Sequence, residues 1–134
     1  YRFMMYIYLF GAMAAFMLHP IGAQVWYFSL YWLIPIAARL LAPNNLLAKS
    51  LGTTFTAHAV GGVLWIYATN MGAEAWIALI PVVAIERTAF AIGIAATYIA
   101  FNTVLDLAYD KLPQGIVNVN KKYSLLQLVS HTHA

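Results

Sequence analysis

Two long stretches of this chain carry no charged side chain, and no other feature limits its fold as strongly. No Asp, Glu, Lys or Arg lies between Arg2 and Arg39, and none lies from Ser50 to Ala73. A helix needs about 20 apolar residues to cross the core of a bilayer, so each stretch is long enough for at least one span. The sequence therefore predicts an all-α integral membrane protein.

The composition supports the same class. Hydrophobic residues make up 63% of the 134 residues and charged residues only 8%, whereas a soluble domain has about 45–50% apolar and about 25% charged residues. This excludes a soluble enzyme, a disordered tail and a nucleic-acid-binding module, so we expect the lipid bilayer and no nucleic acid as partners. Because the chain has no cysteine, it has neither disulfides nor thiolate metal ligands.

Helix-breaking residues divide the chain into about four transmembrane helices. We predict these spans at about residues 3–18, 25–42, 51–69 and 86–108. As one helix, residues 74–109 would be roughly 54 Å long at 1.5 Å per residue, which exceeds a bilayer core about 30 Å thick. One long helix would also place Glu86 and Arg87 inside hydrocarbon. We therefore predict a break near Pro81, with a short interfacial or re-entrant segment at residues 75–85 before the last span.

The basic residues predict the orientation in the membrane. Six of them fall on one side of the four-span arrangement: Arg2, Arg39, Lys49, Lys111, Lys121 and Lys122. Cytoplasmic loops are enriched in Lys and Arg, so we expect a multi-pass protein of the cytoplasmic membrane with both ends in the cytoplasm. Residues 1–110 then form the transmembrane bundle and residues 111–134 a polar cytoplasmic tail.

Aromatic and small residues refine this picture. Five aromatic side chains gather at the predicted outer boundary as interfacial anchors: Trp26, Tyr27, Trp65, Tyr67 and Trp76. A second set recurs at intervals of four and three on the last span, and we call it the small-residue stripe: Ala89, Gly93, Ala96, Ala100 and Thr103. Such a stripe lets a neighbouring helix approach closely, so we expect helix packing there.

The third span carries the first candidate binding residues. Thr54, His58, Gly61 and Trp65 stand at offsets of zero, four, seven and eleven, which places them on one helical face. A hydroxyl, an imidazole, a gap and an indole in line are suited to one wall of a pocket for a planar molecule. An ionisable residue within a span indicates a functional site, although His58 can equally tie two helices together by a hydrogen bond.

Glu86, Arg87 and Asn102 complete the candidate substrate-binding set. Adjacent residues of a helix point about 100° apart, so Glu86 and Arg87 are not expected to face each other, and at least one needs a partner elsewhere. We place them near the outer mouth of the bundle, where they bind a ligand or form a structural ion-pair network. Asn102 lies deeper, where an amide also serves as a hydrogen bond between helices.

The sequence lacks the residue sets of the common membrane enzymes. Haem ligation needs two histidines at matched depth, whereas His58 lies within a span and His19 at the end of one. No H-E-x-x-H motif is present, and His131 and His133 make only a weak metal motif near the end of the chain. We therefore expect no enzymatic activity, no cofactor and no metal.

One segment resembles a known family. The stretch His58-Ala-Val-Gly-Gly-Val-Leu-Trp65-Ile-Tyr67-Ala, followed by Ala75-Trp76-Ile77, is similar to a pattern in the substrate-binding S components of energy-coupling factor (ECF) vitamin transporters. The likeness covers about residues 52–102. It implies a six-helix bundle that binds a vitamin-like molecule near the outer face and docks on a transmembrane coupling subunit with ATPases.

On this resemblance, His58 and Trp65 match the pocket pattern, and Glu86, Arg87 and Asn102 occupy the corresponding region. The chain departs from the family in having four spans instead of six and no alanine-spaced docking helix. Because the sequence begins at Tyr1 and not Met, we expect a preceding part that accounts for both. The alternative is an accessory structural subunit that packs within a larger membrane complex by its small-residue stripe.

Overall fold

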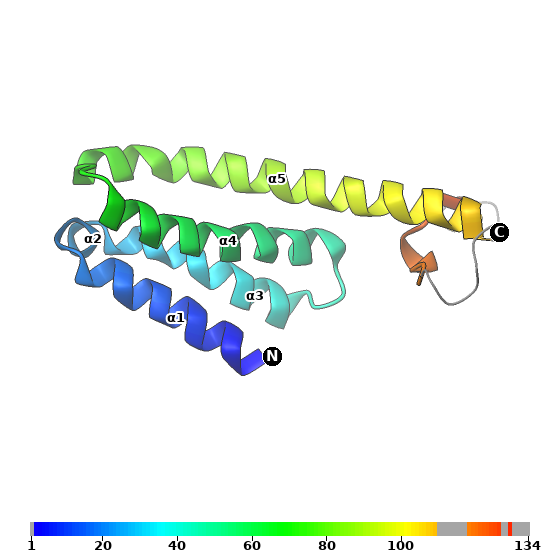
Figure 1. Cartoon of the computed structure of the whole chain (residues 1–134), viewed down its shortest axis with the longest axis horizontal. Helices are drawn as coiled ribbons and strands as arrows, with labels where there is room; N and C mark the ends of the chain where they lie inside the picture. The colour runs from blue at the N-terminus through cyan, green and yellow to red at the C-terminus, as the bar shows by residue number, and fades with distance from the viewer. Residues whose placement is uncertain (1, 110–117, 127–128, 130–134) are drawn as a thin grey trace. The chain divides into compact units, whose positions relative to one another are not determined.

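The computed structural model describes residues 2–109, 118–126 and 129. Every regular element in these residues is a helix (Figure 1), which confirms the all-α class. The chain divides into two compact units, Tyr1–Ile92 and Gly93–Ala134, and each is described by itself. Of the predicted tail, residues 111–117, 127–128 and 130–134 lie outside the described part, and so do Lys111, His131 and His133.

The first unit consists of passes that alternate in direction and are joined by short turns (Figure 1). Its elements are α1 (Arg2–Leu18), α2 (Pro20–Gln24), η1 (Trp26–Leu33), α3 (Ile34–Leu41), α4 (Leu46–Ala68) and the first part of α5 (Ala73–Ala108). Helix α4 packs against α3 and α1, and α1 packs against η1. The spans predicted at 3–18 and 51–69 correspond to α1 and to most of α4.

Side-chain caps fix two of the turns. The Nδ1 atom of His19 accepts a hydrogen bond of 3.2 Å from the backbone N–H of Ile21 at the start of α2. The Asn45 side chain accepts one of 3.0 Å from the backbone N–H of Ala48 at the start of α4. Caps of this kind satisfy N–H groups that have no partner inside the helix, so each turn ends at a defined residue.

The span predicted at residues 25–42 is not one continuous α-helix. It begins as the 3-10 helix η1 and becomes the α-helix α3 at Ile34, with Pro35 in the first turn of α3. Proline is tolerated there because its missing N–H would have no partner inside the helix. The Ile34 N–H donates to the Tyr31 carbonyl, so that carbonyl has a partner even though Pro35 has no N–H.

Helix α5 is continuous from Ala73 to Ala108 with Pro81 inside it, so the predicted break and the separate re-entrant segment are wrong. The break was predicted because a straight helix would place Arg87 in lipid. The Arg87 side chain is instead only 20% exposed and pairs with Glu86. Beside Pro81, the Tyr31 hydroxyl donates a hydrogen bond of 2.9 Å to the Ile80 carbonyl, which joins α5 to η1 at the proline.

Four aromatic side chains form the centre of the first unit, and we call them the aromatic core: Phe16, Phe28, Trp32 and Trp76. The Phe16 ring lies 5.3 Å from that of Trp32 and 5.2 Å from that of Trp76, both edge to face. The Phe28 and Trp76 rings lie 5.0 Å apart. Trp76 is 2% exposed, so its assignment as an interfacial anchor is wrong, whereas the other four predicted anchors are exposed.

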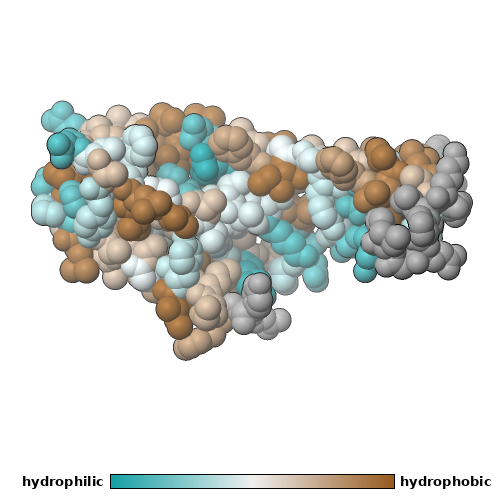
Figure 2. Space-filling model, in the orientation of Figure 1, coloured by the Kyte–Doolittle hydropathy of each residue, from teal (hydrophilic) through white to brown (hydrophobic). Residues whose placement is uncertain are grey.

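The surface of both units is apolar over much of its area. Figure 2 shows hydrophobic side chains on the visible face. By length and composition, α5 is the one helix among the described residues that is long and apolar enough to cross a membrane, while the segments Phe3–Leu18 and Trp26–Leu41 are apolar but shorter. The all-helical class is thus established.

The contact between α4 and the aromatic core gives a test of the packing. A Cβ atom at Gly62 would lie 2.8 Å from Cζ2 of Trp32, whereas one at Gly61 would meet nothing within 4 Å. We expect Gly62→Ala to cost about 1–3 kcal/mol by overpacking, less the gain of up to about 1 kcal/mol that alanine brings to a helix. Thermal unfolding in detergent should show a lower Tm.

Gly61→Ala is the matched control, one residue away in the same helix. It gains the helix propensity without the collision, so its Tm should equal or exceed that of the wild type. If the two variants unfold at the same temperature, Trp32 does not pack against α4 as described.

Candidate functional site

Thr54, His58, Glu86 and Arg87 are brought together by α4 and α5, and we call them the polar cluster. The Thr54 hydroxyl lies 3.1 Å from the Leu51 carbonyl and 3.3 Å from the Arg87 carbonyl. A hydroxyl inside a helix commonly bonds a carbonyl of its own preceding turn, and here the same hydroxyl also reaches the neighbouring helix. Thr54 therefore links α4 to α5 next to the two charged residues.

His58 lies one turn further along α4 from Thr54 and is half-buried. Its ring packs against those of Phe28 and Phe55, with centroid distances of 5.8 Å and 6.3 Å. The imidazole lies within electrostatic range of Arg87 and Glu86. Its Nε2 atom is buried, and no hydrogen-bond partner for it exists among the described residues. Buried polar atoms are normally paired, so this one has an unmet bonding capacity.

Glu86 and Arg87 pair with each other, contrary to the expectation that adjacent residues face apart. The Nη2 atom of Arg87 lies 3.3 Å from Oε2 of Glu86, because the long arginine side chain can fold back toward its neighbour. The Arg87 guanidinium also lies 4.7 Å from the centre of the Phe90 ring, a distance at which cation and ring attract. Its Nε atom is buried and has no partner in the described part of the chain.

The helical register of α5 explains why Arg87 faces inward. Trp76, Ile80, Val83 and Arg87 follow one another at intervals of four, three and four, which puts them on one face. Trp76 and Val83 on that face are buried. The Glu86–Arg87 pair therefore lies roughly 20 Å along the helix from Ala73, at 1.5 Å per residue, and not at the start of the last helix, where the predicted break would put it.

Trp65 and Gly61 do not join the polar cluster. The Trp65 side chain is 55% exposed, and its indole N–H donates to the Met71 sulfur at 2.9 Å, in the loop after α4. Gly61 faces open space. The sequence pattern correctly placed Thr54 and His58 on one face, but Trp65 stands near the end of α4, where its ring turns to the loop instead of the neighbouring helices.

Asn102 belongs to the second unit, where its amide is used by the protein itself. Its Nδ2 donates to the Tyr98 carbonyl at 2.8 Å, and its Oδ1 accepts from the Asn120 backbone N–H at 3.0 Å. Asn120 directly precedes one turn of 3-10 helix, η3 (Lys121–Tyr123). These two bonds favour a structural role for Asn102, the second of the two interpretations that its sequence position allows.

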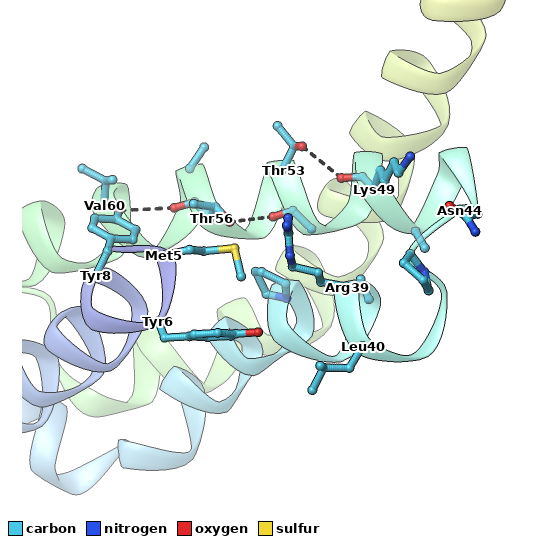
Figure 3. Close-up of a pocket in the computed structure, with 16 residues that line it drawn as sticks. Met5, Tyr6, Tyr8, Arg39, Leu40, Asn44, Lys49, Thr53, Thr56 and Val60 are labelled. Carbon is cyan, nitrogen blue, oxygen red and sulfur yellow. Dashed lines mark hydrogen bonds between the residues drawn. The ribbon is translucent and has the colours of Figure 1, made fainter. Parts of the chain in front are cut away.

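A pocket that the sequence analysis did not predict lies on another side of α4. It has a volume of about 1190 Å³ and is lined by α1, α3, α4 and the turn between the last two. Figure 3 shows Arg39 and Lys49 among the lining side chains. The charge pattern of the sequence places these two residues only on the basic side of the membrane. The one sequence signal that could have grouped Arg39 and Lys49 is that they stand on either side of the same short turn.

Comparison with known proteins adds no family assignment. No protein-family model matches the chain, and no curated protein or solved structure resembles it significantly. Within residues 2–109, 118–126 and 129, no three His, Asp or Glu side chains are grouped so that they could hold a metal ion. The geometry of the polar cluster and of the pocket is therefore what bears on function.

The role of Asn102 can be tested by proteolysis. Asn102→Leu removes both hydrogen bonds, each worth about 1 kcal/mol, so the segment around Lys121 and Lys122 should open more often. Where reclosing is fast, cleavage follows the open population. We expect trypsin to cut after these lysines about tenfold faster, measured by mass spectrometry of timed digests.

Phe101→Leu introduces the same residue at the neighbouring position, where the side chain is 65% exposed. It should leave the cleavage rate at the wild-type value. Equal rates for Asn102→Leu and the wild type would show that Asn102 does not hold this segment.

Proposed function

We propose that the chain crosses the membrane four times, through α1, the η1–α3 pass, α4 and α5. At about 1.5 Å per α-helical and 2.0 Å per 3-10 residue, these passes are roughly 26, 28, 35 and 54 Å long, and each comes close to or exceeds a core about 30 Å thick. The alternating directions of the passes in the first unit support this topology (Figure 1). The position of Arg39 and Lys49 at one end of the first unit, beside the α3–α4 turn, also supports this topology.

We further propose that the protein is the small-molecule-binding subunit of an uptake transporter, and that the polar cluster contacts the molecule. The described residues hold five buried side-chain polar atoms without a partner, on Trp32, His58, Trp76, Arg87 and Ser124. The observation that carries this proposal is that two of them, His58 Nε2 and Arg87 Nε, belong to ionisable groups within electrostatic range of each other. Leaving such an atom unpaired costs about 1–3 kcal/mol, and an ionisable group inside a membrane indicates a functional site. A bound molecule would supply the missing partners.

The chemistry of the two atoms limits the molecule. Arg87 Nε is a donor and needs a carbonyl or carboxylate oxygen. His58 Nε2 donates or accepts according to the tautomer, and its ring lies beside Phe28 and Phe55. A small planar molecule with an oxygen acceptor fits both requirements. A vitamin-like solute has this chemistry, in keeping with the resemblance of residues 52–102 to ECF-type S components.

The topology is tested by cysteine labelling, since the chain has no cysteine of its own. Single cysteines replace Lys49, Gly72 and Lys121. We expect a probe that cannot cross membranes to label position 72 in intact cells, and positions 49 and 121 only after permeabilisation. Equal labelling of positions 49 and 72 in intact cells would contradict the four-span arrangement.

The binding role is tested by native mass spectrometry of gently purified protein. We expect the wild type to retain a small molecule, and His58→Phe and Arg87→Gln each to weaken retention about tenfold, since an unpaired polar partner costs about 1–3 kcal/mol. The Tm of His58→Phe should remain near the wild-type value, because the imidazole nitrogen that is lost bonds nothing in the described structure.

His19→Phe is the matched control, with the same substitution at a histidine that caps α2. It should retain the molecule, with a lower Tm from the lost cap. A His58→Phe variant that keeps the molecule but unfolds at a lower temperature would contradict the binding role.

One observation favours the alternative, an accessory subunit of a larger membrane complex. The members of the small-residue stripe from Ala89 to Ala100 are exposed along α5, and a Cβ at Gly93 would meet nothing within 4 Å. Close packing of another helix against such a surface is common in membranes. The same native spectra decide the question, because partner subunits retained without any small molecule would favour the accessory role.

A further inference from the structure

The pocket of Figure 3 combines two chemically different ends. Lys49 and Asn44 lie at one end near the α3–α4 turn, and the Arg39 side chain reaches toward α4. Met5, Tyr8 and Val60 lie at the other end, where α1 meets α4. The pocket is partly open to the surroundings. Its lining thus runs from cationic to apolar along α4.

The cationic end has no negative partner within the protein. No Asp or Glu lines the pocket, and neither Arg39 nor Lys49 belongs to an ion pair within the described ranges. The acidic residues of the first unit are Glu74 and Glu86, both on α5. Two cations beside one pocket without a carboxylate attract an anion, and an arginine with a lysine suits a phosphate group in particular.

From its cationic to its apolar end, the pocket has the length along α4 that one leaflet requires. From Lys49 to Val60, α4 rises roughly 16 Å at 1.5 Å per residue, about half of a bilayer core 30 Å thick. The Tyr8 hydroxyl in this part is used within the protein, since it donates to the Thr56 carbonyl at 3.4 Å. A free phosphorylated solute would use the cations but leave this apolar length unfilled. A phospholipid would use both ends.

We infer that this pocket binds one anionic phospholipid of the cytoplasmic leaflet, with its phosphate between Arg39 and Lys49 and an acyl chain along Met5 and Val60. The inference rests on the proposed topology, which puts both cations at the cytoplasmic boundary. Basic pockets between membrane helices on that side are known to hold lipid head groups. This site is separate from the polar cluster, because Thr54 and His58 do not line it.

The test is a titration of phosphatidylglycerol into the purified full chain in detergent micelles, with bound lipid counted by native mass spectrometry. We expect one phosphatidylglycerol to bind in preference to phosphatidylcholine. Arg39→Gln/Lys49→Gln should weaken its binding about 30-fold, from about tenfold per 1.4 kcal/mol and about 1 kcal/mol for each cation. Arg39→Lys/Lys49→Arg keeps both charges and should bind nearly as well as the wild type.

Lys121→Gln/Lys122→Gln is the matched control, since it removes the same charge in the second unit and should bind like the wild type. A second variant, Ala57→Phe, fills the pocket while both cations remain, and it should also weaken binding. Tm values for all variants show which are folded.

Equal binding by the wild type and the Arg39→Gln/Lys49→Gln variant would overturn the inference, and so would an equal loss in the control. Glycerol phosphate that displaces the lipid at equal concentration would assign the site to a free phosphorylated solute instead. Because the titration is made in micelles, it measures the pocket itself. Failure of the topology would appear separately, in the cysteine labelling.

Discussion

The edge-to-face packing of Trp76 against the stacked rings of Phe16 and Phe28 is the contact on which the candidate site depends. Trp76 lies near the start of α5 and fixes this helix against α1 and η1. Its ring lies 5.2 Å from that of Phe16 on α1 and 5.0 Å from that of Phe28 on η1. Once Trp76 is fixed, the helical period decides which residues follow it on the inner face. Ile80 then meets the Tyr31 hydroxyl and Arg87 meets Thr54. The indole thus determines where the charged pair Glu86 and Arg87 lies, ten and eleven residues further on.

Much of the helical layout could be read from the sequence because its signals are local. The end of α1 follows from His19 and Pro20, and the start of α4 follows from a turn that contains Pro43 and a capping Asn45. The continuity of α5 could not be read in this way. A break was predicted because an unbroken helix would place the Arg87 side chain in lipid. In the structure Arg87 instead pairs with Glu86 and lies over the Phe90 ring. Those contacts depend on folding.

The same distinction applies to the candidate sites. Periodicity placed Thr54 and His58 on one face, because helix geometry alone determines that relation. It also placed Trp65 there, but the Met71 sulfur draws that indole to the loop. The pocket with Arg39 and Lys49 was not predicted, because its lining comes from three helices and a turn. Hydropathy and charge rules assign basic residues to a side of the membrane, and they do not say which of them share a cavity.

The 3-10 helix η1 has a consequence for how such chains are recognised. Its eight residues rise roughly 4 Å more than the same number of α-helical residues, at about 2.0 Å against 1.5 Å each. On the proposed topology, the second pass crosses the bilayer with fewer residues than a hydropathy window of about 19 assumes. An aromatic segment in 3-10 conformation therefore spans a given thickness with fewer residues than an α-helix needs. Counting passes by window length will therefore undercount them in small, aromatic-rich membrane proteins.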